Sequence, residues 1–476
     1  MEHSLIHAHL TNLQASYSFA VAAEDPLKAA DCFLPGECLP LSAAAGIHLF
    51  HSPHLLISAD GRSAQVTWES YGYTADRSES AMMTTRFAAE AVFTADGWRY
   101  RNADWVVMQK FEPLPFSAEQ DSICHPPVPI PDGPLPDAHS CRVLRNLAGI
   151  LCANNWRDCE SLFAPSACAD LEGLTDGCIP AEAWLRETAD CEAHAGGRYR
   201  CLPILGPGYI CSESSDRARG LWLCQVFEVK LENGAQVIQR RICSLDLQFI
   251  RSERWRISSL TLRTVQALSD IPGAGTRYER MTFPESNWLY TSFEPDTPCE
   301  DSALAVENIF ALWPVSVHRG NLMRFFRHYL CQPDTVLSIR SQGPQTPPKT
   351  GPEEISGKLT PMDASFRPPH LTYHCATTPV IQQMEPDVIR ASWIDHSLTN
   401  LGPRSDGSAG YMVFVTRYDH VFRRIRGHWY LTEFNWEPCL GFPDESFVSL
   451  PGAGQGWAAS HPDQLYPLPL GLNDYE

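Results

Sequence analysis

The chain has 476 residues, too many for one ordinary hydrophobic core, and divides more naturally into about three domains of roughly 100–150 residues each. Its 37 basic and 56 acidic residues give a formal charge of -19, which argues against the phosphate backbone of nucleic acids and against anionic membrane surfaces as main partners. The N-terminal sequence lacks the basic and apolar segments of an export signal. No apolar run approaches the roughly 18 residues of a membrane span, so we expect a cytoplasmic protein.

Seventeen cysteines raise two alternatives, a disulfide scaffold and a metal site. Their number is odd and no export signal precedes them, which argues against disulfides. The sequence contains neither CxxC nor HExxH, and His48 and His51 would lie on opposite faces of a strand, which argues against zinc. We therefore expect reduced, mostly buried thiols, and neither a metal ion nor an organic cofactor.

The first unit begins with apolar residues at helical spacing, from Leu5 to Phe33. Asp25 followed by Pro26 predicts a break into two helices, with Asp25 as the N-cap of the second helix. From Ile47 onward the apolar period becomes two, which predicts four strands, with turns at Asp60-Gly61 and Asp96-Gly97. Helices followed by antiparallel strands indicate an α+β domain.

Two further units repeat this order after proline-rich linkers, which form neither helix nor sheet. Helices are predicted from Cys141 to Phe163 and from Leu304 to Leu330, each followed by strands, with a Pro/Gly-rich insertion at Ser341–Gly351. The predicted boundaries are 1–118, 139–272 and 301–447 for the domains, 119–138 and 273–300 for the linkers, and 448–476 for a Pro/Gly-rich tail.

One hairpin pattern indicates a repeat. Arg86, in the sequence Thr-Arg-Phe, stands twelve residues before Trp98 and nineteen before Trp105. Arg417, in the sequence Thr-Arg-Tyr, stands at the same distances from Trp429 and Trp436. A looser copy between them has Trp255 at the turn and Leu262 in place of the second tryptophan. We therefore predict one domain type used three times in tandem.

A second set of landmarks keeps the same order in all three units. Pro53 precedes Trp68 by fifteen residues, Pro207 precedes Trp222 by fifteen, and Pro379 precedes Trp393 by fourteen. Phe33, Phe163 and Phe326 are predicted to close the second helix of each unit.

Three groups of residues carry a family resemblance: EDPLKAADCF and NNWRDCESLF at the helix, H-x-x-x-(S/T)-P in the first strand, and DGW before the last strand. The pattern resembles the nuclear transport factor 2-like superfamily, particularly SnoaL-like domains. This resemblance implies three tandem cone-shaped α+β domains, each with N-terminal helices packed on a curved antiparallel β-sheet around an apolar pocket. Members of the superfamily include ketosteroid isomerase, polyketide cyclases, dehydratases and non-catalytic binding modules.

His48 and His374 occupy the same position in the repeat, where the second unit has Leu202. An imidazole has an unperturbed pKa of about 6.5, so it can act as a general acid or base near neutral pH. The resemblance places a histidine with that role at a similar position. The structural alternative is a buried histidine that is hydrogen-bonded to a backbone carbonyl.

Arg86 and Arg417 would bind a carboxylate or an enolate oxygen if they pointed into the pocket. The alternation of side chains along a strand does not decide which face they are on, because a slip of one residue moves a side chain to the other face. Asp25 is implied by the resemblance as a base or orienting residue, whereas its position before Pro26 favours a helix cap. Tyr17, on the first helix, would donate a hydrogen bond to a substrate or simply pack in the core.

Secondary candidates are Asp395 and His396, just after Trp393, and the acidic or amide side chains of Asp104, Glu433 and Asn435 on the last strands. Strict alternation would place Trp98, Tyr100, Asn102 and Asp104 on one face, and likewise Trp429, Leu431, Glu433 and Asn435.

These residues lead to two hypotheses. The first is a cofactor-independent lyase or isomerase, acting by dehydratase-like proton transfer on an apolar cyclic carbonyl compound, as a base and oxyanion donors in a dry pocket suffice for such chemistry. The second is a non-catalytic protein that binds a small apolar ligand or assembles a complex. In either case the expected partner is a small apolar molecule, and a homodimer through the outer sheet faces is a further expectation.

Overall fold

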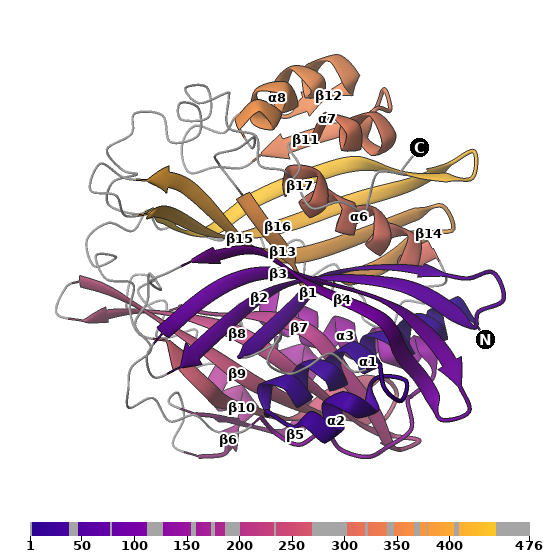
Figure 1. Cartoon of the computed structure of the whole chain (residues 1–476), viewed down its shortest axis with the longest axis vertical. Coiled ribbons are helices and arrows are strands. Elements are labelled where there is room, and N and C mark those ends of the chain that lie inside the picture. Colours follow the sequence, from indigo (N-terminus) through magenta and orange to yellow (C-terminus); the bar gives the residue numbers. More distant parts are fainter. Residues whose placement is uncertain are drawn as a thin grey trace.

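The computed structural model describes residues 2–37, 46–76, 79–111, 127–153, 159–172, 177–185, 200–232, 235–268, 302–318, 322–339, 347–365, 372–377, 379–403 and 409–443. Helices and three separate β-sheets form in this part of the chain, so the predicted α+β class is confirmed (Figure 1). We call residues 2–111 the first unit, 127–268 the second unit and 302–443 the third unit, because each supplies one sheet and the helices that precede it.

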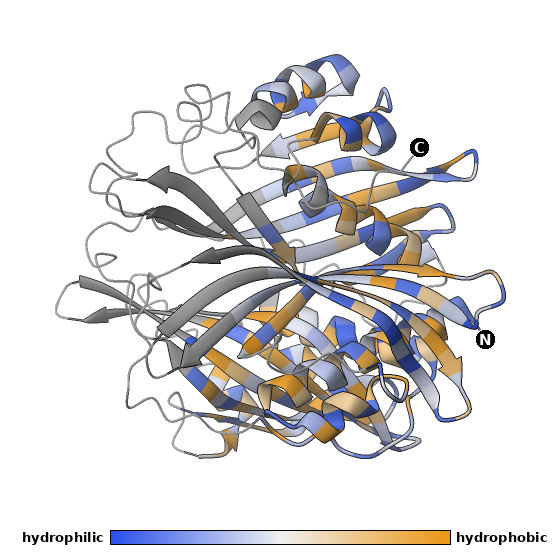
Figure 2. Cartoon of the chain, viewed as in Figure 1, coloured by the Kyte–Doolittle hydropathy of each residue, from blue (hydrophilic) through white to orange (hydrophobic). Residues whose placement is uncertain are grey.

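The first unit starts with two helices, as its apolar spacing predicts. They are α1 (His3–Ala22) and α2 (Pro26–Asp31). Four antiparallel strands follow in the order β1-β2-β3-β4: β1 (Ile47–Ile57), β2 (Ser63–Asp76), β3 (Glu79–Thr94) and β4 (Gly97–Phe111). Polar and apolar residues alternate along these strands (Figure 2), so each strand offers one face to the interior of its unit.

The second unit has one long helix, α3 (Ala138–Ala153), and a short 3-10 turn, η2 (Glu160–Leu162). Its sheet has the order β6-β5-β10-β9-β8-β7, formed by β5 (Phe163–Leu171), β6 (Ile179–Pro180), β7 (Arg200–Ser214), β8 (Arg217–Glu232), β9 (Ala235–Arg251) and β10 (Trp255–Leu268). The predicted helix up to Phe163 is therefore wrong at its end, because Phe163 begins a strand that pairs in parallel with β10.

The third unit has helices α6 (Ser302–His318) and α7 (Leu322–Phe325), and a π-helical turn η3 (Phe326–Leu330). Its strands are β11 (Val336–Ile339), β12 (Lys349–Thr350), β13 (Thr372–Ala376), β14 (Val380–Glu385), β15 (Val388–Pro403), β16 (Ala409–Ile425) and β17 (His428–Pro443). They pair in the order β12-β11-β17-β16-β15-β13, and β14 also pairs with β15.

The end of the predicted Pro/Gly-rich insertion proved to be ordered structure. Helix α8 (Gly351–Ser365) begins there, with Pro352 in its first turn and Glu353 and Glu354 beside the positive end of the helix dipole. Proline is tolerated in the first turn because its missing N–H would be unbonded there anyway, so this proline starts a helix.

The three landmark prolines interrupt the edge strands of the three sheets. The pairing of β1 with β2 shifts between His51 and His54, around Pro53, and that of β7 with β8 shifts between Leu205 and Gly208, around Pro207. Pro379 lies in the gap between β13 and β14. Proline has no N–H for the ladder, so it is confined to such bulges and edges.

Each sheet buries its inner face and part of its outer face. The inner face packs on the helices of its own unit, as Phe50 and Trp68 do in the first sheet and Trp393 and Tyr418 do in the third. The outer face of the first and third sheets joins the core of the second unit, through residues such as Leu49, Tyr71, Cys375, Ile394 and Val415. The three units thus share one buried centre.

An asparagine from each unit holds the edge strand of another unit, and we call these three contacts the asparagine clasps. Asn12 of α1 bonds the C=O and N–H of Ile210 at 2.7 and 3.0 Å. Asn146 of α3 bonds those of Ile381 at 2.9 and 3.1 Å. Asn308 of α6 bonds those of Leu55 at 2.8 and 2.9 Å.

The clasps connect the units in a closed ring of three contacts. The first unit holds the second, the second holds the third, and the third holds the first. The three clasped residues occupy equivalent positions in their sheets. Leu55 pairs with Val66, Ile210 with Gly220 and Ile381 with Ala391. Each of these pairing partners lies two residues before the core tryptophan of its strand. Edge-strand backbone groups that would otherwise be open are satisfied in this way.

A buried ionic cluster lies where α1, α3 and α6 meet. The carboxylate of Glu307 accepts a hydrogen bond from Arg142 and lies 2.7 Å from His7 Nε2. Burial would raise the pKa of Glu307, but the positive partners outweigh it and lower that pKa to about 2. Each helix contributes one partner, so the charge network joins all three units.

Within the described residues, no helix is both long and apolar enough to cross a membrane. The cysteines of these residues are free thiols, and most of them are buried.

Candidate functional site

The three sheets can be compared position by position through their strand pairing. Trp68 pairs with Phe87 in the first sheet, Trp222 with Leu245 in the second, and Trp393 with Tyr418 in the third. All six side chains belong to the buried cores. Because side chains alternate along a strand, the residue two positions further on lies on the same inner face.

At that next inner position only the third sheet carries a charge. Ser70 pairs with Thr85 in the first sheet, Cys224 with Cys243 in the second, and Asp395 with Thr416 in the third. The side chain of Asp395 is only 1% exposed. A carboxylate so deeply buried requires partners, because desolvation of an unpaired charge is very costly.

On the edge strand of the first and third sheets, a histidine occupies the inner-face position next to Ser70 or Asp395. His48 lies two residues before Phe50, which pairs with Ser70, and His374 lies two residues before Ala376, which pairs with Asp395. In the second sheet Leu205 pairs with Cys224, so the matching residue is Pro203. The prediction of Leu202 is therefore wrong by one residue, because the second unit has one residue fewer before its proline. The conclusion that this unit lacks the histidine is unaffected.

His374 and Asp395 form a buried dyad in the third unit. The Nδ1 atom of His374 lies 2.7 Å from the Oδ2 atom of Asp395, and the histidine side chain is 5% exposed. A carboxylate accepts at this distance, so Nδ1 of a neutral His374 carries the proton and the lone pair lies on Nε2. The second carboxylate oxygen, Oδ1, is buried and has no hydrogen-bond partner among the described residues. This arrangement fixes the tautomer that a general base needs.

Tyr418 lies beside the dyad and holds a neutral hydroxyl. Burial, and then the negative charge of Asp395, raise the pKa of Tyr418 well above its usual value of 10. Its hydroxyl oxygen accepts a hydrogen bond from Trp313 Nε1 at 3.3 Å. The accepted bond leaves the hydroxyl proton for another acceptor, which gives this site a donor beside a base.

The first unit has a polar but uncharged version of this arrangement. Ser70 Oγ lies 3.4 Å from His48 Nδ1 and 2.5 Å from Thr85 Oγ1. The His48 ring packs edge-on against Trp105, with centroids 4.5 Å apart. Tyr17 is fully buried in the same core, its centroid 6.1 Å from that of Trp105. Tyr17 and His48 thus line one core, with serine where the third unit has aspartate.

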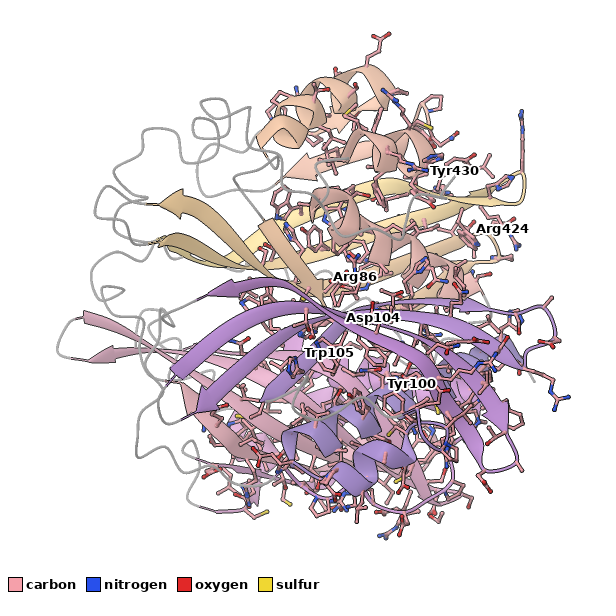
Figure 3. All side chains as sticks on the ribbon, in the orientation of Figure 1. Arg86, Tyr100, Asp104, Trp105, Arg424 and Tyr430 are labelled. Atoms are coloured by element: carbon pink, nitrogen blue, oxygen red, sulfur yellow. The ribbon has the colours of Figure 1, made fainter. Side chains whose placement is uncertain are left out.

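Arg86 lies on the face opposite His48. Thr85 and Phe87, its neighbours on β3, face the inner core, and Arg86 instead donates through Nε to Glu69 at 2.7 Å (Figure 3). Its guanidinium is therefore engaged in an ion pair with Glu69 on the face of the sheet opposite the inner core. Arg417 holds the corresponding backbone position on β16, but its side chain lies outside the described residues.

Asp25 acts as a helix cap. Its carboxylate accepts hydrogen bonds from the backbone N–H groups of Leu27 and Lys28, at 3.2 and 3.1 Å. This contact accounts for the Asp-Pro sequence by local helix chemistry.

Two bulges overturn the predicted alternation on the last strands. In β4 the pairing shifts between Arg101 and Asp104, so Tyr100 and Trp105 both face the core while Asp104 is exposed (Figure 3). In β17 a similar shift puts Leu431, Phe434 and Trp436 on the core side and leaves Glu433 exposed. A bulge adds one residue and so reverses the face of everything beyond it.

Sequence reasoning did not single out Tyr418 or His420 as functional residues. His420 faces the same core, and the matching positions are Ala89 and Leu247, each two residues beyond Phe87 or Leu245. Extending the repeat comparison along β16 would have revealed both. No group of three His, Cys, Asp or Glu side chains in the described part of the chain is placed to hold a metal ion.

No family model and no curated protein matches the sequence. Solved structures similar to part of the chain include LinA (15% identity, 30% of this chain and 88% of that one, TM-score 0.24) and a putative scytalone dehydratase from Novosphingobium aromaticivorans (11%, 29% and 85%, 0.25). A putative dehydratase of the NTF2-like family from Streptomyces avermitilis matches at 17% identity over 29% of this chain and 95% of that one, with a TM-score of 0.25. Similarities this low carry no argument about activity.

Proposed function

We propose that the chain consists of three tandem, diverged copies of one SnoaL-like, cone-shaped domain, closed into a ring by the asparagine clasps. The matching strand registers and the common clasp position support this interpretation. The ring occupies edge strands and parts of the outer sheet faces within one chain, as where Tyr71 donates to the His396 carbonyl at 3.1 Å. This favours a monomer over the homodimer through sheet faces that the sequence suggested.

We propose that the third unit is the catalytic one, and that it is a cofactor-independent lyase or isomerase for a small apolar cyclic carbonyl compound. The observation that carries this proposal is the buried His374–Asp395 dyad, which neither of the other units matches. At the positions that Asp395 and Tyr418 occupy in the third unit, the first unit has serine and phenylalanine and the second has cysteine and leucine. The polarity of these inner positions is therefore highest in the third unit. The first and second units then serve chiefly to complete the ring.

In the proposed reaction His374 Nε2 removes a proton from the carbon next to the carbonyl group of the substrate. The electrons of that C–H bond form an enolate, whose oxygen accepts a hydrogen bond from the Tyr418 hydroxyl. Asp395 holds the imidazole in the required tautomer and stabilises the imidazolium that forms. A dehydration is completed when the β-hydroxyl group leaves with this proton as water, and an isomerisation when the proton returns to another carbon.

The test follows proton removal and requires no knowledge of the natural substrate. Cyclohexanone and 3-hydroxycyclohexanone are incubated with the protein in D₂O, and loss of the α-proton signal is followed by NMR. Asp395→Asn and His374→Ala should each lower the protein-catalysed exchange by about 10²-fold or more, the usual contribution of a positioned base. His48→Ala should leave it within about twofold, because the first unit has Ser70 at the position that Asp395 occupies in the third.

Exchange that survives both substitutions in the third unit would refute the proposal, and so would exchange that only His48→Ala abolishes. Thermal melts of all three variants separate lost chemistry from lost folding. Nitrogen-15 NMR of labelled histidine gives a further check, since His374 should carry its proton on Nδ1 in the wild type.

A further inference from the structure

The strand that carries His374 is held only on one side by its own sheet. It is β13, which has five residues and lies at the end of the strand order, beside β15. A short edge strand leaves its outer backbone groups open and is the least constrained part of a sheet. The 2.7 Å distance from His374 Nδ1 to Asp395 Oδ2 depends on where β13 lies relative to β15. Contacts from outside the third unit therefore bear on the geometry of the dyad.

The first unit makes one hydrogen bond to each of these two strands. Ser52 Oγ accepts from the backbone N–H of Ala376 on β13 at 2.9 Å. The Tyr71 hydroxyl donates to the carbonyl of His396 on β15 at 3.1 Å. Ala376 pairs directly with Asp395, and His396 is the residue after Asp395. Both bonds thus end beside the carboxylate of the dyad.

These two contacts are shielded from water. The side chain of Ser52 is 5% exposed and that of Tyr71 is fully buried. The Tyr71 ring also packs against the ring of His396, with centroids 4.4 Å apart. Buried hydrogen bonds are costly to break, because the groups that are released find no water. The two strands therefore cannot shift against the first unit without a penalty.

The Ser52 hydroxyl is not needed to bring two units together. The residue directly before the landmark proline of the second unit is Gly206, whose Cβ would lie 3.5 Å from the carbonyl oxygen of Phe50 in the first unit. Phe50 and Ala376 hold matching positions, so the same close approach forms there without a side chain. Ser52 also has a φ of 49°, in the left-handed region that serine seldom adopts. The third matching residue, Thr378, lies outside the described residues.

We propose that Ser52 and Tyr71 are positioning residues for the His374–Asp395 dyad, so that the first unit completes the active site of the third. Ser52 fixes β13, Tyr71 fixes β15, and together they set the distance between the imidazole and the carboxylate. This inference rests on the proposed function of the dyad. It adds a means of regulation, because any change that separates the first unit from the third would weaken the base.

The test uses the double variant Ser52→Gly/Tyr71→Phe. Glycine accepts the left-handed backbone and phenylalanine keeps the aromatic ring, so the variant loses mainly the two hydroxyl groups. Nitrogen-15 NMR of labelled histidine follows the proton on His374 Nδ1. This proton should exchange with water at least about tenfold faster in the variant, because two buried bonds that held the strands are gone. Deuterium exchange into cyclohexanone should fall by about tenfold or more, since a misplaced base transfers protons poorly.

Tyr209→Phe is the matched control. It removes the same kind of bond, from the Tyr209 hydroxyl to the Pro131 carbonyl at 3.3 Å, but within the second unit. It should leave the His374 signal unchanged and the deuterium exchange within about twofold. A purely structural role for Ser52 and Tyr71 predicts a different result, namely a lower melting temperature with an unchanged His374 signal. The single variants Ser52→Gly and Tyr71→Phe carry the same test at a smaller cost to folding.

An unchanged Nδ1 signal of His374 in the folded double variant would overturn the inference, and so would an equal change in Tyr209→Phe. The NMR measurement requires no turnover, so the two proposals fail separately. If the wild type catalyses no deuterium exchange and the His374 signal still responds to the double substitution, only the catalytic role of the dyad is rejected.

Discussion

The side-chain amide of Asn146 in α3 hydrogen-bonds to both the N–H and the C=O of Ile381. Ile381 lies in the third unit, 235 residues later in the sequence. One side-chain amide thus replaces a neighbouring strand at the edge of a sheet. Asn146→Ala should lower the free energy of unfolding by about 1–3 kcal/mol, because the N–H and C=O of Ile381 are buried and would be left unsatisfied. Chemical denaturation with Asn146→Asp as an intermediate variant, which keeps the acceptor and loses the donor, checks this. An unchanged denaturation midpoint in Asn146→Ala would contradict it.

Glu307 should make the stability of the protein fall in acid. Its pKa of about 2 in the folded state lies below the ordinary value of 4.5, so its contribution is fully present above about pH 4.5 and is lost as the pH falls toward 2. Burial also lowers the pKa of His7, which adds a loss as the pH falls below 6.5 because the unfolded state takes up that proton first. Urea denaturation between pH 3 and 8 measures the slope.

Glu307→Gln leaves Arg142 buried without its countercharge and should cost about 3–5 kcal/mol at pH 7, the usual result of breaking one side of a buried pair. The variant should also lose the part of the pH dependence below about 4.5. If the wild type and the variant had parallel stability curves over this range, Glu307 would not be the titrating group.

Gly208 should not tolerate a methyl group. A Cβ atom at this position would lie 2.2 Å from Nε1 of Trp222, whose side chain is only 1% exposed and has no room to move. Gly208→Ala should therefore destabilise the protein by about 1–3 kcal/mol. Gly357→Ala is the control, because its Cβ in helix α8 would meet nothing within 4 Å, and it should stabilise by about 0.5–1 kcal/mol. Thermal melts of both variants distinguish them by sign.

Tyr418→Phe should lower deuterium exchange by about 10²–10³-fold, the usual effect of losing one oxyanion donor. Phenylalanine already occupies the matching position of the first unit, as Phe87, so packing should be preserved. The indole N–H of Trp313 would lose its acceptor, which should cost about 1 kcal/mol of stability. Exchange at the wild-type rate in a folded Tyr418→Phe variant would exclude the phenol from the reaction.

The local patterns predicted much of the fold because they record local physics. Apolar spacing identified α1, and Asp25 before Pro26 marked the start of α2, since capping needs only neighbouring residues. Strands that depend on distant partners were missed, as with β5, which pairs with β10 across about 90 residues. Helix α8 was not predicted; it begins at Gly351, where the predicted Pro/Gly-rich insertion ends, and Pro352 lies in its first turn.

The site was harder to predict because it depends on register. His374 was matched to His48 by counting from a proline, but Asp395 was only a secondary candidate, since nothing local shows that β13 and β15 bring the two side chains within 2.7 Å. The bulge in β4 reversed the expected face of Asp104 for the same reason. A single inserted residue is invisible in a count of alternating positions, yet it decides which side chains meet.

The clasp between Asn308 and Leu55 is the one whose asparagine is synthesised long after the strand that it holds. The strand that it covers lies in the first unit, and its asparagine follows 253 residues later. At the usual rate of about 5–20 residues per second, the ribosome needs roughly 13–50 seconds to supply it. During synthesis the edge strand of the first sheet therefore has unpaired backbone N–H and C=O groups for the longest time. Such an edge can pair with a strand of another nascent chain. Chaperone demand should thus concentrate on strand Ile47–Ile57 until the last unit emerges.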